Sequence, residues 1–95
     1  MASDVTLCIF DPRLGTMVCR RWLGMGGTLD RARHILGRAP HRSRVGMDCW
    51  TDLTASEASS IAEASYAGGA GPAEIDDYAK AFPPPAFWWL LVRDY

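Results

Sequence analysis

Lysine and long apolar runs are the scarcest features of this chain. Lys80 is its single lysine, against nine arginines in 95 residues. The longest apolar run, residues 86–92, is far shorter than the roughly 18 residues that a membrane-spanning helix needs. The first ten residues, MASDVTLCIF, contain neither a basic segment nor a long apolar stretch. We therefore expect no membrane contact and no secretory signal.

Metal-binding and catalytic patterns are missing as well. The three cysteines, Cys8, Cys19 and Cys49, are an odd number without a C-x2-C spacing, which favours reduced thiols in a cytoplasmic protein. His34 and His41 have no nearby second ligand at the spacing that zinc sites use. No motif pairs a nucleophile with a base. We expect no metal, no cofactor and no enzymatic activity.

The composition is that of a small globular domain. Hydrophobic residues make up 48% of the chain and include four tryptophans, which excludes a disordered tail. A chain of this length forms one domain, here residues 1–95, with a thin hydrophobic core.

The first 24 residues predict a hairpin. Apolar residues alternate over residues 5–10 and again over 17–22, a period that is typical of strands. Between them, the segment 11–15 (DPRLG) has the residues of a tight turn. If Asp11 pairs with Thr16, Cys8 lies opposite Cys19. Both faces of this hairpin are apolar, so either both are covered by the fold or one receives a partner.

The remaining chain predicts an α+β domain. A helix is expected over 29–37 with Thr28 as its N-cap, and a second from the capping box Thr54–Glu57 to about residue 67. Pro72 begins a third helix over 73–82. Strands are expected over 45–50 and 87–95, the latter central and buried on both faces, after an extended segment of prolines 83–85. The order β-β-α-β-α-α-β indicates a mostly antiparallel sheet of three to four strands with two to three helices packed on it.

One segment concentrates the positive charge. Residues 31–44 contain no acid. Their cations are Arg31, Arg33, Arg38, Arg42 and Arg44, with His34 and His41. Five guanidinium groups cannot share a dry interior unpaired, so this segment must meet water, phosphate or carboxylate. The spacing predicts that Arg31, His34 and Arg38 share one helix face.

The two halves of the chain have opposite charge. Residues 1–47 carry eight arginines and three aspartates, a net charge of +5, whereas residues 48–95 carry two cations and eight acids, a net charge of −6. Three interpretations of the basic segment stay open. It pairs with the chain's own acids, it contacts the phosphates of a nucleic acid, or it contacts an acidic protein.

Two further groups are candidate contacts. Trp88 and Trp89 are adjacent in a strand, so one packs in the core while the other faces a contact surface, and we take Trp88 as the candidate anchor. Glu74, Asp76 and Asp77 form an acidic cluster at the start of a helix. The helix dipole alone explains acids at that position. Alternatively, they occupy a nucleic-acid-binding channel of another protein.

These observations favour a non-enzymatic protein that binds another protein, with nucleic-acid binding through residues 31–44 or a homo-oligomer as alternatives. No family motif maps onto the chain residue by residue. In its small size, opposed charges and spare aromatic residues, the chain resembles phage-encoded inhibitors of host or defence complexes, such as anti-CRISPR proteins. That resemblance of general character implies an inhibitor that acts by occupying its target.

Overall fold

The computed structural model describes residues 3–42, 48–63 and 70–94. Its elements follow the predicted order, with one short strand added after the first helix. They are β1 (Ser3–Asp11), β2 (Thr16–Gly24), α1 (Gly26–Leu36), β3 (His41–Arg42), β4 (Asp48–Leu53), α2 (Ala55–Glu63), α3 (Pro72–Ala81) and β5 (Phe87–Asp94).

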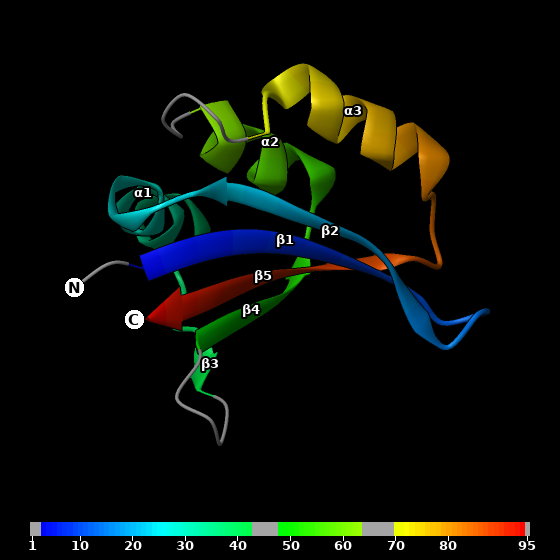
Figure 1. Cartoon of the computed structure of the whole chain (residues 1–95), viewed down its shortest axis with the longest axis horizontal. Helices are drawn as coiled ribbons and strands as arrows, with labels where there is room; N and C mark the ends of the chain where they lie inside the picture. Colours follow the sequence, from blue (N-terminus) through cyan, green and yellow to red (C-terminus); the bar gives the residue numbers. More distant parts are fainter. Residues whose placement is uncertain (1–2, 43–47, 64–69, 95) are drawn as a thin grey trace.

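All strands belong to one antiparallel sheet with the spatial order β2-β1-β5-β4-β3. The last strand of the chain, β5, lies at the centre between β1 and β4, as its apolar sequence predicts. The predicted burial of both its faces is wrong, because the described helices cover only the side of Trp88 and Leu90 and leave Phe87 and Trp89 half-buried on the other side. The four long strands agree with the predicted number, and the two-residue β3 adds a short edge. The three helices lie together on one face of the sheet, so the predicted α+β class is confirmed (Figure 1).

The predicted turn between β1 and β2 is confirmed. The carbonyl of Asp11 accepts hydrogen bonds from the amides of Leu14 (3.1 Å) and Gly15 (2.9 Å). Gly15 has a φ of 65°, a conformation that glycine adopts without steric cost. The Asp11 carboxylate accepts hydrogen bonds from the Arg13 amide and guanidinium, which lower the pKa of Asp11.

The register of this hairpin differs from the simple pairing. Asp11 does lie opposite Thr16, but irregularities follow between Ile9 and Phe10 and again between Val5 and Thr6. Each inserts an extra residue on β2, as a β-bulge does. Cys8 therefore lies opposite Arg20, and the predicted opposition of Cys8 and Cys19 is wrong.

Helix α1 begins earlier than its sequence predicts. Met25 is the N-cap, and its carbonyl accepts hydrogen bonds from the amides of Thr28 and Leu29. Thr28 is thus inside the helix and fully buried, and its hydroxyl has no hydrogen-bond partner among the described residues. The predicted end is correct: Gly37 adopts a φ of 61° and its amide bonds the Arg33 carbonyl.

The second half of the chain agrees with most of its predicted boundaries. Strand β4 begins at Asp48 and reaches Leu53, whereas predicted positions 45–47 and the predicted helical positions 64–67 lie outside the described residues. Pro72 is the first residue of α3. Prolines 83–85 form a turn rather than an extended segment: the Ala86 amide donates to the Pro83 carbonyl (3.1 Å), and the Pro84–Pro85 peptide bond is cis.

The hydrophobic core lies between the sheet and the helices. Trp50, Leu7 and Leu90 are among its largest fully buried side chains. Helix α1 contributes Leu29, Ala32 and Leu36, α2 contributes Ala58, Ile61 and Ala62, and α3 contributes Ile75. None of the helices in the described ranges combines the length and the apolarity that crossing a membrane demands.

The capping box of α2 provides a first testable prediction. The Glu57 carboxylate accepts a hydrogen bond from the Thr54 amide (2.9 Å), and the Thr54 hydroxyl accepts one from the Glu57 amide (3.1 Å). We expect Thr54→Ala to lower the free energy of unfolding by about 1 kcal/mol, because an N-terminal amide loses its partner. Urea denaturation measures this change, with Ser60→Ala, at an exposed position of the same helix, as the matched control. Equal midpoints for the two variants would contradict the prediction.

Candidate binding surface

One face of the sheet is covered by none of the helices in the described residues, and it carries aromatic side chains. Successive residues of a strand point to opposite faces, so Trp88 and Leu90 face the helices while Phe87 and Trp89 face away. Phe10 of β1 lies opposite Phe87, and Cys8 lies opposite Trp89. Three rings from two neighbouring strands therefore meet on the uncovered face.

These rings form a compact group, which we call the aromatic cluster: Phe10, Phe87 and Trp89. The Phe10 and Phe87 rings are stacked, with centroids 5.7 Å apart and an angle of 7° between their planes. Trp89 is tilted at 44° to both rings, with its centroid 4.8 Å from Phe10 and 5.7 Å from Phe87. All three side chains are half-buried, so the cluster still exposes apolar surface.

Neighbouring residues extend this surface. Met17 lies opposite Phe10 on β2, Leu91 follows Trp89 two residues later on β5, and Arg20 lies opposite Cys8. Met17 and Leu91 are half-buried and Arg20 is exposed. We call the whole area the aromatic face: Phe10, Met17, Arg20, Phe87, Trp89 and Leu91.

Cys8 lies buried within the aromatic face. Burial raises the pKa of the Cys8 thiol above its ordinary value, and the neighbouring Arg20 guanidinium opposes this effect without cancelling it. The thiol is therefore protonated at neutral pH. A protonated, buried thiol behaves as a small apolar group beside the rings.

The predicted anchor tryptophan lies on the other side of the sheet. Trp88 is 5% exposed and pairs with Ile9 and Leu53, both core residues. Trp88 is therefore a core residue, and the tryptophan on the uncovered face is Trp89. The alternation of the strand predicts that one of the two is buried, but it does not tell which, because that depends on which side the helices pack.

The predicted basic surface is divided by the fold. Arg31 and Arg33 are exposed on α1, and neither forms an ion pair with another described residue. Because they are two residues apart on a helix, their side chains point in nearly opposite directions. Arg38 does not continue this helix face, because the chain turns at Gly37. Its guanidinium donates hydrogen bonds to Glu57 Oε2 (3.2 Å) and to the Thr51 carbonyl (3.1 Å). Arg44 and the side chain of Arg42 lie outside the described residues.

The predicted acidic cluster is also divided. Asp76 and Asp77 are exposed, as predicted. Glu74 turns toward β2 instead, where its carboxylate accepts hydrogen bonds from Arg21 Nε (3.0 Å) and from the Tyr78 hydroxyl (3.0 Å). Two ion pairs, Arg21–Glu74 and Arg38–Glu57, thus join the basic and acidic halves of the chain.

The half-buried Tyr78, whose hydroxyl donates a hydrogen bond to Glu74, makes the stability of the fold decrease at alkaline pH. Burial, together with the hydrogen bond that its hydroxyl donates to Glu74, raises the pKa of Tyr78 to about 12. Because this pKa lies above the unfolded value of about 10, the stabilisation is complete below pH 10 and is lost as the pH rises toward 12. We expect wild type to lose more stability over this range than Tyr78→Phe does. Urea midpoints measured at several alkaline pH values test this, and parallel curves would rule it out.

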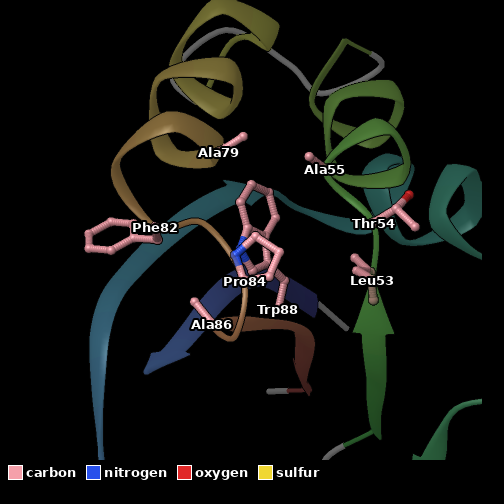
Figure 2. Close-up of a pocket in the computed structure, with 8 residues that line it drawn as sticks. All are labelled: Leu53, Thr54, Ala55, Ala79, Phe82, Pro84, Ala86 and Trp88. Carbon is pink, nitrogen blue, oxygen red and sulfur yellow. The ribbon is translucent and has the colours of Figure 1, made fainter. Parts of the chain in front are cut away.

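A small pocket lies on the helix side of the sheet, between the start of α2 and the end of α3 (Figure 2). Its volume is about 200 Å³. The lining residues are mostly alanines, proline and large apolar side chains: Leu53, Thr54, Ala55, Ala79, Phe82, Pro84, Ala86 and Trp88. The sequence contains no signal for this pocket, because it depends on how α2 and α3 diverge above β5.

Metal-binding geometry is not found in the part of the chain that the structure describes, where no three His, Cys, Asp or Glu side chains gather around one point. His41 and Cys49 do lie opposite each other on β3 and β4, but without a third ligand of these types.

Comparison with known proteins identifies no further residue of a functional site. No protein-family model, no curated protein and no solved structure matches this chain.

Proposed function

We propose that this chain is a non-enzymatic binding protein that contacts another protein through the aromatic face. The observation that carries the proposal is the position of the aromatic cluster on the sheet face that the described helices α1, α2 and α3 leave uncovered. An antiparallel sheet with one face in water normally alternates apolar and polar residues. Here β5 places Phe87, Trp89 and Leu91 on the uncovered face and Trp88, Leu90 and Val92 in the core.

The composition of the aromatic face fits a protein contact. Aromatic residues, methionine and arginine are the types that protein interfaces enrich, and tryptophan and arginine contribute most to affinity. Trp89 lies within the aromatic cluster. The exposed Arg20 lies opposite Cys8 on the same sheet face, where its guanidinium would contact a carboxylate of the partner. An inhibitor of a host or defence complex would act in this way, by covering a surface that the target needs.

Nucleic-acid binding is less well supported by the same geometry. Base stacking needs free ring faces, but Phe10 and Phe87 stack on each other and Trp89 leans on both. The arginines that the described strands place on this face are Arg20 and Arg93, and Arg93 lies opposite Asp4. The chain as a whole has a net charge of −1, unlike the basic domains that bind nucleic acids.

The experiment that tests the proposal is affinity capture with three forms of the chain. Wild type, Phe87→Ser and Arg33→Glu are immobilised, incubated with nuclease-treated lysate of the source cells, and compared by quantitative mass spectrometry. We expect a partner that wild type and Arg33→Glu retain equally and that Phe87→Ser loses. If Arg33→Glu loses the partner and Phe87→Ser retains it, the contact lies on α1 and not on the aromatic face.

A mobility-shift assay with single-stranded and duplex DNA and RNA separates the two classes of partner. We expect no retardation at low salt. Retardation at low salt that is lost steeply between 50 and 200 mM salt is typical of phosphate contacts. That result would contradict the proposal and identify a nucleic acid as the partner.

A further inference from the structure

We propose that the pocket between α2, α3 and β5 is a binding site for a small uncharged aromatic molecule about the size of toluene or indole. This site is separate from the aromatic face, because Trp88 points to the helix side of β5 and Trp89 to the opposite side. The test of one site therefore does not decide the other.

The space exists because small side chains occupy facing positions. Ala55 at the start of α2 and Ala79 near the end of α3 point toward each other across the pocket, with Trp88 and Pro84 below them (Figure 2). A larger side chain at either alanine would enter the same space. The pocket therefore exists because Ala55 and Ala79 have only a methyl group at positions where longer side chains would fill the space between the helices.

The lining favours an apolar occupant over water. Seven of the eight lining residues are alanine, leucine, proline or aromatic. The remaining one is Thr54, whose hydroxyl already accepts the Glu57 amide in the capping box. A well-held water needs two to four polar partners, and displacing a poorly held water by an apolar group gains affinity.

The size and the walls define the class of ligand. A cavity of roughly 150 Å³ lined by apolar side chains is enough to bind benzene in another protein. The pocket between α2 and α3 has about 200 Å³, which accommodates one aromatic ring with a small substituent or one fused pair of rings. Trp88 and Pro84 offer flat surfaces against which such a ring packs, whereas the ring of Phe82 points away from the pocket (Figure 2).

Titration with toluene and with indole, followed by two-dimensional amide NMR, tests the proposal on the intact chain. We expect saturable shifts confined to residues around the pocket, such as Ala55, Ala79 and Ala86, with an affinity in the millimolar range that ligands of fewer than about ten non-hydrogen atoms reach. Nuclear Overhauser effects between toluene protons and Trp88 should accompany these shifts. Shifts that do not saturate, or that scatter over the surface, would overturn the proposal.

A pair of variants locates the binding. Ala79→Leu fills the pocket and should lower the affinity for toluene at least tenfold. Ala81→Leu makes the same change at an exposed position of α3 and should leave the affinity unchanged. Should Ala79→Leu fail to fold, the contacts between toluene and Trp88 in wild type decide the matter. Equal affinity in both variants would mean that toluene binds elsewhere.

Discussion

Trp50→Ala is expected to lower the free energy of unfolding by about 3–5 kcal/mol, the loss typical of truncating a large aromatic side chain in a protein core. Trp50 is 1% exposed and is the largest of the fully buried side chains. Its indole also donates a hydrogen bond of 2.8 Å to the Arg38 carbonyl, which ties β4 to the segment after α1. The alanine variant therefore leaves a cavity and an unpaired carbonyl together.

The expected loss is a large part of the 5–15 kcal/mol that a domain of this kind has in total. Thermal and urea denaturation measure it, and for a domain of this length it corresponds to a fall in melting temperature of roughly 15–30 °C. Trp50→Phe separates the two contributions, because it keeps most of the volume and removes the N–H donor. If Trp50→Ala unfolds at the same urea concentration as wild type, the position assigned to Trp50 in the core is wrong.

Trp89→Ala is expected to weaken binding of the partner protein at least about 30-fold, or about 2 kcal/mol, the magnitude typical of a tryptophan at the centre of an interface. The reason is that Trp89 contacts both other rings of the aromatic cluster, so its removal also loosens Phe10 and Phe87. Isothermal titration with the captured partner measures the change.

Two controls accompany this variant. Arg33→Ala, at an exposed position of α1, should change the affinity less than about twofold, the range expected for a residue outside the contact. Trp89→Ala should also lose less stability than Trp50→Ala, because its side chain is half-buried rather than fully buried. An unchanged affinity with a normal fold would remove the aromatic face from the interface.

Local signals in the sequence predict much of this fold. Asp11 and Gly15 mark the turn, Thr54 and Glu57 mark the start of α2, and Gly37 marks the end of α1. Each of these depends on hydrogen bonds or backbone angles within a few residues, so the sequence around the position contains the necessary information. The apolar composition of β5 predicts its central place correctly. It also predicts burial of both faces, and this is wrong, because the described helices cover only one side of the sheet.

Features that depend on contacts between segments far apart in the sequence cannot be predicted from local signals. The bulges of β2 change the partner of Cys8, and the side on which the helices pack decides that Trp88 is buried and Trp89 is not. The aromatic cluster depends on the pairing of Phe10 with Phe87, more than 70 residues apart in the chain. The composition of each strand is visible in the sequence, whereas the register that brings these rings together is not.

The charges illustrate the same distinction. The sequence predicts that its arginines must be solvated or paired, and the structure shows both outcomes. Arg38 and Arg21 pair with glutamates from the acidic half, while Arg31 and Arg33 stay exposed. The opposite charges of the two halves are therefore used in part to hold the fold together, which reduces the basic surface that a partner could contact.

The indole N–H resonances of the four tryptophans provide the most direct measurement of where the partner binds. Trp50 and Trp88 report from the core, whereas Trp89 and Trp22 lie on or near the uncovered sheet face, and single Trp→Phe variants assign each resonance. On addition of the partner we expect the Trp89 resonance to shift or broaden while those of Trp50 and Trp88 stay in place. A partner that binds while the Trp89 resonance is unchanged contacts some other surface, and the aromatic face is then not the functional site.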